Sequence, residues 1–545
     1  MKRFAVLLVA LATLAAGCTR ASSTVSVAGG RHPWTHPGLL RIAELGEADT
    51  LNPMLTAYQE PVDISMFWAG YLFNYDDRNQ WVPELATTVP TLANGGISRD
   101  GLTITYHLRR GVTWQDGAPF TADDVVFSWH AVMNPENNVQ TRGGYDDVQS
   151  IAEPDKYTAV VRLKHRFAPF VATFFTMSSA PMPVLPKHLL AQYPNINRAA
   201  YNGKPVGTGP FIVKSWQRGE AVRMVANPHY WRGAPKLHEV DFEAIEDENT
   251  IATTIRSHGI DLWHNAGATL YPVVKNIPDT HVILSPFTQY SYIGLNGSRG
   301  PLRDPEVRRA LVYATDRKTL IDRITYGVQL LGEGDQPAFS WAHDPHLKPI
   351  PFDPARARAM LDAAGWHVGP NGIRTKNGVP LRLEVATTTG GAVGNRLAVL
   401  LQSAYRAVGV DLEVKQYAAA MMFAAYQNGG ILQAGKFDLE FSSWVNGVDP
   451  DDSTTVTCAA IPPNGQNVFR FCDPVVDANE KIALTSYEQA VRARAYANVQ
   501  EQLVQQVPFI TEWFWRQMEV VSDDVHGFKP AHAVTPFWNT WELST

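Results

Sequence analysis

The sequence has few cysteines and few charged residues, and both shortages narrow what the protein can be. Only three of its 545 residues are cysteine, 18% are charged, and the formal net charge is −6. A net negative charge provides no basic surface of the kind that nucleic-acid binding usually needs, so no nucleic-acid partner is expected. The cysteines at 458 and 472 have no suitably spaced histidine nearby, which argues against a zinc site.

The sequence also lacks the motifs of common enzymes. It has no G-x-S-x-G elbow, no H-E-x-x-H pair and no P-loop. Ligand-type residues gather at 343–346 and at 449–452, but a solvated loop and a locally capped turn explain these groups better than a metal ion. We therefore expect no catalytic residues, no metal and no cofactor.

No apolar run after the N-terminal region is long enough to cross a membrane. Lys2 and Arg3 precede the apolar run Phe4–Leu14, which is shorter than the roughly 20 residues of a spanning helix, and small residues lead to Cys18. This is the pattern of a signal peptide, and it resembles a bacterial lipoprotein signal. We expect removal of residues 1–17, lipidation of Cys18 and an exported protein tethered to the outer face of a membrane; an ordinary secretory signal is the alternative.

Two further expectations follow from export. Without Cys18, the even pair Cys458 and Cys472 remains, and an oxidising compartment favours a disulfide between them over two free thiols. Residues 18–38 are rich in small and polar residues and in proline, which predicts a flexible tether between the lipid and the folded part.

Strand and helix patterns alternate along the remaining chain. A helix capped by Thr121 runs to about Met133, with Asp124 at the capping-box position, and an apolar stretch at 62–73 suggests a buried helix. Helices also start at the Asp-Pro steps 304–305 and 353–354. The hydrophobic pattern predicts a strand, a helix and a strand at 381–386, 395–408 and 410–414. This order predicts a parallel pair of strands in an α/β protein.

The segment Gly207–Leu237 predicts a hairpin, with short strands at 211–213 and 221–225. As a whole string it resembles the signature of the family 5 extracellular solute-binding proteins, the peptide- and nickel-binding group. Further matching strings follow in the family's order at 106–112, 119–125, 304–311 and 353–357. The resemblance implies the ligand-capturing component of an ABC importer: a monomer that is not an enzyme, with a small-molecule ligand and membrane permease subunits as partners.

The same resemblance implies a fold. It is an α/β, two-lobed periplasmic-binding-protein-like fold of class II, in the large cluster with an extra subdomain, and its ligand cleft lies between the lobes. Lobe I would comprise residues 39–290 plus 513–545, and lobe II residues 291–512. The crossovers near Tyr290–Ile293 and Phe509–Trp513 would act as a hinge.

The resemblance also points to a site. In peptide-binding members a loop after the strand at 437–443 places a tryptophan near the ligand and an aspartate against the α-ammonium of the peptide. Trp444 and Asp449 match this pattern, but the expected aspartate is absent, and Asn446 or Gly447 stands in its place. Because a buried ammonium needs an anionic partner, either Asp449 supplies it or the ligand is not a simple peptide with a free N-terminus.

Other loops expected to face the cleft supply the remaining candidates: Tyr58, Gln59, Glu60, Trp263, His264 and Tyr290. Aromatic faces with a few polar groups suit peptides, sugars and haem alike. An oligopeptide or dipeptide is the leading cargo. The alternatives are an oligosaccharide, haem or a chelated metal, or a sensory receptor with the same fold; an exported hydrolase is a third class.

Overall fold

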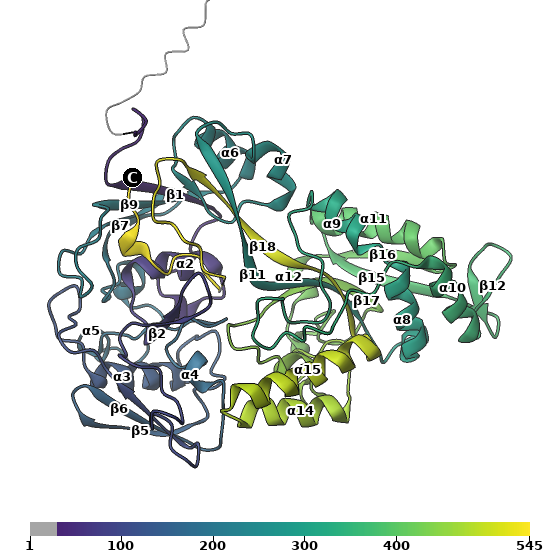
Figure 1. Ribbon diagram of the computed structural model, residues 1–545, viewed down its shortest axis with the longest axis horizontal. Coiled ribbons are helices and arrows are strands. Elements are labelled where there is room, and N and C mark those ends of the chain that lie inside the picture. Colours follow the sequence, from purple (N-terminus) through teal and green to yellow (C-terminus); the bar gives the residue numbers. More distant parts are fainter. Residues whose placement is uncertain (1–29, 533) are drawn as a thin grey trace, which may run out of the picture.

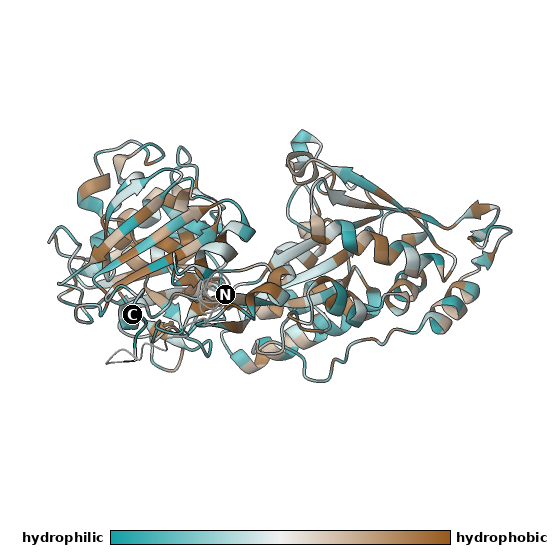
Figure 2. Ribbon diagram, turned by 90° about the horizontal axis from the view of Figure 1, so that it is seen from above, coloured by the Kyte–Doolittle hydropathy of each residue, from teal (hydrophilic) through white to brown (hydrophobic). Residues whose placement is uncertain are grey.

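The computed structural model describes residues 30–532 and 534–545, and it has the expected two-lobed α/β architecture (Figure 1). The lobes are joined by two long strands, β11 (Thr280–Leu295) and β18 (Phe509–Ser522), which pair antiparallel along most of their length. Figure 2 shows the two bodies side by side with a narrow connection. The predicted signal peptide and Cys18 lie outside the described residues.

In the described residues the largest sheet has ten strands and extends through both lobes. Its strands, from the lobe II edge to the lobe I edge, are β16 (Asp411–Tyr417), β15 (Arg382–Thr388), β17 (Leu439–Val445), β11, β18, β10 (Leu262–Trp263), β1 (Leu39–Leu45), β9 (Glu239–Ile245), β8 (Ala221–Ala226) and β7 (Phe211–Gln217). The hairpin predicted within 207–237 is β7–β8, with Phe211 opposite Ala226. The predicted parallel pair is β15–β16, connected by α11 (Ala392–Arg406).

Lobe I carries an additional small sheet. It consists of β4 (Thr103–His107), β6 (Thr158–Leu163) and β5 (Val148–Asp155), and α3 (Ala122–Met133) packs on it. The Asp124 carboxylate accepts a hydrogen bond from the Thr121 N–H at 3.0 Å, as the capping box predicts. The other elements of this lobe are the short strands β2 (Phe73–Tyr75) and β3 (Trp81–Pro83) and the helices α4 (Phe170–Thr173), α5 (Lys187–Leu190), α6 (Glu248–Arg256) and α7 (Tyr271–Val274).

The helix expected at 62–73 differs from the observed one. Helix α2 spans Gln59–Trp68, and Phe73 already belongs to strand β2. A continuous apolar run does not separate a buried helix from a buried strand. Gly70 lies in the connection, where a Cβ atom would stand 2.0 Å from Thr208 Oγ1, so a tight approach of two chain segments ends the helix.

Lobe II is built mainly of helices that cover its end of the sheet. Besides α11, they are α8 (Pro305–Ala314), α9 (Arg317–Ile324), α10 (Pro354–Ala363), α12 (Ala419–Met422), α13 (Ser453–Val456), α14 (Pro474–Thr485) and α15 (Gln489–Gln506). A small sheet of β12 (His367–Val368), β13 (Arg374–Lys376) and β14 (Val379–Pro380) lies at the far end. The Asp304 and Asp353 side chains accept hydrogen bonds from the Glu306 and Arg356 N–H groups, both at 2.9 Å. Both Asp-Pro steps therefore start helices as predicted.

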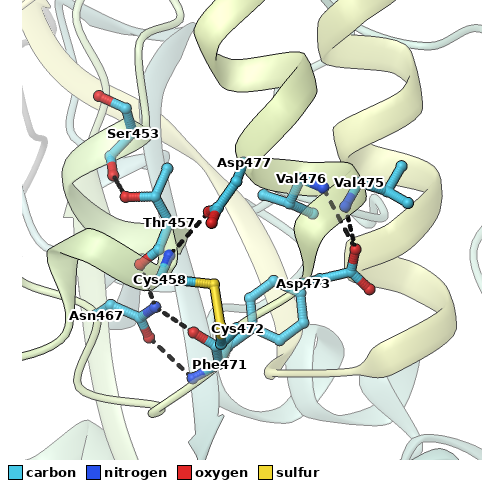
Figure 3. Close-up of a disulfide and its surroundings, with 10 residues drawn as sticks. All are labelled: Ser453, Thr457, Cys458, Asn467, Phe471, Cys472, Asp473, Val475, Val476 and Asp477. Carbon is cyan, nitrogen blue, oxygen red and sulfur yellow. Dashed lines mark hydrogen bonds between the residues drawn. A yellow bond between two sulfur atoms is a disulfide. The ribbon is translucent and has the colours of Figure 1, made fainter.

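The predicted disulfide joins Cys458 to Cys472 (Figure 3). The loop that it closes is also held from inside by Asn467, whose amide donates to the Thr457 carbonyl at 2.9 Å and to the Phe471 carbonyl at 2.7 Å. The Asp477 carboxylate on α14 accepts a hydrogen bond from the Cys458 N–H at 2.9 Å. This loop is therefore fastened to the helical layer of lobe II.

The expected tether of residues 18–38 requires a correction over its described part. His32 donates its N–H to Asp524 Oδ2 at 2.9 Å, and the Gly38 N–H donates to Thr545 Oγ1 at 2.9 Å. Trp34 stacks on His258 with ring centroids 4.0 Å apart. Arg31 also donates to the Thr545 carbonyl, so residues 31–38 contact lobe I instead of forming part of a free tether.

Across residues 30–532 and 534–545, no helix combines the length and apolarity that crossing a membrane requires.

Candidate functional site

A cavity of about 410 Å³ lies between the two lobes. Lobe I contributes Thr288 and residues from 75–97 and 168–172, and lobe II contributes residues from 336–341, 446–449 and 487–492. Its volume falls in the range of small-molecule sites, and a position between two lobes is typical of such sites.

Five aromatic side chains form the apolar walls: Tyr75, Trp81, Phe339, Trp341 and Tyr487. Tyr75 and Trp81 come from the neighbouring strands β2 and β3, and their ring centroids lie 4.6 Å apart. Trp81 remains 37% exposed and is therefore the aromatic face most open to a ligand. Flat faces of this kind bury a large apolar area and stack on planar groups.

Four polar atoms of the lining residues are buried and have no hydrogen-bond partner among the described residues. They are Tyr75 Oη, Asn79 Oδ1, Thr288 Oγ1 and Asn446 Oδ1. A buried polar atom without a partner costs about 1–3 kcal/mol. These atoms are therefore suited to binding the polar groups of a ligand, and the two amide oxygens can only accept hydrogen bonds.

The charges of the cavity wall are mostly engaged within the protein. Asp449 receives two hydrogen bonds from Arg492 on α15, with both N···O distances at 2.7 Å. Arg492 also donates to the Ala483 carbonyl at 2.9 Å and to the Tyr496 hydroxyl at 3.2 Å. Burial lowers the pKa of Arg492, but the facing carboxylate outweighs burial and the net shift is upward. Asp449 is therefore neutralised by a partner that stays charged.

Arg78 is the other cationic residue of the lining, and it lies exposed in the turn between β2 and β3. It forms no ion pair with any part of the chain that the structure describes. It can therefore attract an anionic group of a ligand, although exposure to solvent weakens that attraction.

Buried acids lie behind the cavity floor and add little negative charge to it. Burial raises the pKa of Asp335 and of Asp452, and it raises the pKa of Glu480 to about 8. Asp335 is connected to the floor by Gln336, which donates to its Oδ2 at 2.6 Å, and by Asn446, which donates to its carbonyl at 2.9 Å. Burial therefore favours the protonated form of these acids over a free carboxylate.

The structure places three of the predicted site residues on the cavity wall, namely Asn446, Gly447 and Asp449. Trp444 on β17 pairs with Tyr290 on β11, and the loop that reaches the cavity begins only after Trp444. Neither residue is among the described lining residues. Tyr290 is 2% exposed and packs against Tyr292, Phe509 and Phe514 in the core. Both were expected to line the cleft, and in the described structure they lie in the paired strands beside it.

The five candidates from lobe I also lie away from the cavity wall that the structure describes. Tyr58 is 61% exposed just before α2, and Gln59 donates to Asp63 Oδ1 at 3.2 Å and to the Val534 carbonyl at 2.9 Å. Glu60 lines a different, smaller recess. Trp263 and His264 are completely buried. Trp263 belongs to β10 and His264 follows it, and β10 runs in the middle of the sheet between β1 and β18, so this segment ends inside the lobe.

Sequence reasoning missed several segments of the wall, among them the turn at 75–81 and the loop at 336–341. The first has a recognisable signal, because two aromatic residues flank a polar turn, which is the pattern of a hairpin with an aromatic face. The second has none, since it is a loop without periodicity that enters the site from a separate part of lobe II.

Comparison with known proteins agrees with this architecture. Residues 80–464 match the family profile "Bacterial extracellular solute-binding proteins, family 5 Middle". A di/tripeptide-binding protein 2 of Pseudomonas aeruginosa is 28% identical over 85% of this chain and 88% of its own length, and heme-binding protein A of Haemophilus influenzae is 28% identical over 77% and 78%.

A solved structure supports the fold. NikA from Brucella suis, in complex with Fe(III)-EDTA, superposes with a TM-score of 0.80 over 93% of this chain and 99% of its own, at 22% identity. The family profile covers well over half of the chain. With the inter-lobe cavity and the two connecting strands, these matches lead to one conclusion: the chain belongs to family 5 of the bacterial extracellular solute-binding proteins.

Proposed function

We propose that this protein captures a small peptide in the cavity between its lobes and delivers it to the permease of an ABC importer. The observation that carries the proposal is the cavity wall, in which flat aromatic faces alternate with buried polar atoms that have no partner in the described chain. A peptide offers both kinds of group in repetition, since amide N–H groups suit the asparagine oxygens and side chains suit the aromatic faces.

The charged residues of the cavity wall indicate where each end of such a peptide would bind. Arg78 would attract the C-terminal carboxylate, because it is the cationic lining residue without an ion pair in the described residues. The N-terminus would meet neutral acceptors, Asn79 Oδ1 and Asn446 Oδ1, because Arg492 already occupies both oxygens of Asp449. Recognition would therefore depend little on a free α-ammonium.

The same neutral acceptors favour a second cargo, an oligosaccharide. Sugars stack on aromatic faces and exchange hydrogen bonds with amides and hydroxyls without needing an opposite charge. Haem or a chelated metal is the remaining alternative, and heme-binding protein A of Haemophilus influenzae is similar to this chain. Identification of the bound solute decides between these cargoes.

The rest of the proposal concerns the protein's place in the cell. We propose an exported monomer, anchored through lipidated Cys18 to the outer face of a membrane, that binds its solute without chemical turnover.

We also propose lobe I as residues 39–290 plus 513–545 and lobe II as residues 291–512. The pairing of β11 with β18 shifts register between Pro286 and Tyr290 and again between Ser291 and Tyr292, and such irregular pairing favours bending between lobes. The alternative is a sensory receptor, in which closure of the two lobes on the solute would signal to a membrane partner without import.

Native mass spectrometry of the protein as purified, followed by calorimetric titration with the released solute, tests the cargo. Peptide masses support the proposal, whereas sugar or haem masses alone overturn it. Steady turnover of any peptide by the purified protein would instead indicate a hydrolase.

Modified peptides then test how the two ends are recognised. N-acetylation should change the affinity less than threefold, and C-terminal amidation should weaken binding about tenfold, the effect of roughly 1.4 kcal/mol for a charge-assisted contact. Arg78→Gln should remove the preference for the free carboxylate, while Arg99→Gln, an exposed arginine outside the lining residues, should keep it. A strong loss on acetylation would contradict the assignment of the N-terminus.

A further inference from the structure

A second group of functional side chains lies in lobe I, outside the cavity. It consists of Glu44 on β1, Asp63 on α2, His264 after β10 and Glu519 on β18. All four side chains are buried, with His264, Asp63 and Glu519 showing no exposed surface. The solute site described above does not use them.

The sheet explains why these residues meet. Ala43 pairs with Trp263 in the parallel β1–β10 ladder, and Trp263 pairs with Val520 in the antiparallel β10–β18 ladder. The next position on each strand therefore aligns Glu44, His264 and Glu519 in one row across three neighbouring strands. Asp63 reaches this row from helix α2.

Three atoms of the group converge without hydrogen-bond partners in the described residues. Glu44 Oε2, Asp63 Oδ2 and His264 Nε2 are buried and unpartnered. His264 Nε2 lies 3.4 Å from Asp63 Oδ2 and 3.9 Å from Glu44 Oε1, and one ligand atom of each residue lies within 4.8 Å of the other two. Two ligands of a tetrahedral zinc ion, each at about 2.0–2.1 Å, are separated by roughly 3.3 Å. The observed spacing is close to that of a metal-binding triad.

The surrounding residues hold two of the three side chains in the orientation that a metal ion needs. His264 Nδ1 lies 3.0 Å from both oxygens of Glu519, so an Nδ1–H donated to Glu519 leaves the Nε2 lone pair directed at Asp63 and Glu44. Gln59 donates to Asp63 Oδ1 at 3.2 Å and leaves Oδ2 free to face His264. A carboxylate behind a ligating imidazole is the usual support of a histidine metal ligand.

The group gathers three carboxyl groups around one imidazole, and it adjoins a recess. Glu44, Asp63 and Glu519 are buried, and each has a carboxyl oxygen within 3.9 Å of a ring nitrogen of His264. A metal ion at this point would bring the positive charge that buried carboxylates require. Glu44 also lines a recess of about 20 Å³ together with Glu60, and this is enough volume for a water molecule.

We propose that Glu44, Asp63 and His264 bind a divalent transition-metal ion, with Zn²⁺ the best fit to one imidazole and two carboxylates. Glu519 is the positioning residue for His264, and water or Glu60 completes the coordination through the recess. The ion would connect α2 to strands β1 and β10, so its role would be to stabilise lobe I. The site is separate from the solute cavity.

The test uses the full mature chain, stripped with EDTA, checked for retained fold by circular dichroism, and reloaded with Zn²⁺ alone. After dialysis, mass spectrometry of the metal content should find one equivalent of zinc, and the melting temperature should rise with zinc. Glu44→Gln and Asp63→Asn, which keep the side-chain shape, should weaken zinc binding at least 100-fold. Glu519→Gln should weaken it about tenfold, because its effect passes through His264.

A double His343→Gln/His346→Gln variant is the matched control, since it removes two histidines from a lobe II loop that is also rich in metal-type ligands. It should retain zinc. Should a triad variant fail to fold, anomalous diffraction from zinc-loaded crystals of the unaltered chain locates the ion directly. A peak between Glu44, Asp63 and His264 supports the proposal; a peak elsewhere, or wild-type protein that retains no zinc, overturns it.

Discussion

Replacing Asp449 by asparagine separates two roles that a carboxylate in the cavity wall can have. If Asp449 serves as the counter-ion of Arg492, the substitution leaves a buried guanidinium without its anionic partner, and the protein loses stability. If Asp449 instead binds the ammonium of a ligand, the substitution lowers the affinity for free peptides and leaves stability almost unchanged.

The structure sets the expected size of the stability loss. The Arg492 and Asp449 side chains are 8% and 14% exposed, and both N···O distances are 2.7 Å. Removing one partner of a buried ion pair costs about 3–5 kcal/mol. Asparagine still accepts one hydrogen bond, and Arg492 keeps its contacts with Ala483 and Tyr496, so we expect the lower end, about 3 kcal/mol. For a lobe of this size, that loss lowers the melting temperature by roughly 6–12 °C.

Differential scanning calorimetry of the ligand-free protein measures this loss. Asp449→Asn and Arg492→Gln should each be destabilised, and the double variant should be more stable than the sum of the two losses predicts, by about 1 kcal/mol or more. Asp523→Asn, an exposed aspartate paired with His281, is the control and should shift stability by less than about 0.5 kcal/mol. A melting temperature of Asp449→Asn within 2 °C of the wild type, with a tenfold loss of affinity confined to peptides with a free N-terminus, would refute this reasoning.

Three further predictions concern the disulfide, a buried acid and the aromatic walls. Cys458 and Cys472 should resist alkylation until a reductant is added, and labelling without reductant would contradict the disulfide. Replacing both by alanine should lower the free energy of unfolding by about 3 kcal/mol for a loop of this length, measured by thermal melting. Burial raises the pKa of Glu440 to about 8, so the folded state keeps a proton that the unfolded state releases above about pH 4.5. The free energy of unfolding should therefore fall between about pH 4.5 and pH 8, by up to about 1.4 kcal/mol per pH unit. Glu440→Gln should flatten this slope in thermal melts recorded across that pH range. Trp81→Ala should weaken solute binding about tenfold by calorimetry, whereas Trp444→Ala, which lies off the described wall, should weaken it less, and equal losses would return Trp444 to the site.

The features that sequence reasoning predicted correctly are those with local physical causes. The Asp-Pro steps at 304 and 353 place a side-chain acceptor and a proline at the positions where a helix leaves N–H groups unpaired, so both helix starts could be assigned without tertiary information. The β15–α11–β16 unit could be predicted because its hydrophobic pattern changes period twice within about 35 residues. The expectation for the helix at 62–73 was off by several residues at both ends because burial on all sides removes that periodicity.

The candidate site was less accessible to such reasoning, since its residues meet only after long-range packing. The turn at 75–81, the loop at 336–341 and residue 492 are far apart in sequence, and the cavity exists only where the lobes bring them together. Trp263 and His264 were expected in the cleft because a loop was expected to follow a strand at 260–262 there. The position of β10 in the middle of the sheet, which no local pattern reveals, puts His264 in the interior instead.

The residues that reveal the family and those that line the cavity are different, and the structure explains why. The signature string 207–237 forms the β7–β8 edge of the sheet, and within the described chain no cavity-lining residue comes from it. Its glycine at 207 is required by packing, because a Cβ atom there would stand 1.8 Å from the Trp68 carbonyl oxygen. A substitution in that hairpin would therefore damage lobe I whatever the cargo, whereas the wall segments 75–81, 336–341 and 446–449 can change without disturbing the hairpin. It follows that two proteins sharing this signature can bind unrelated solutes, and that cargo should be argued from those three segments.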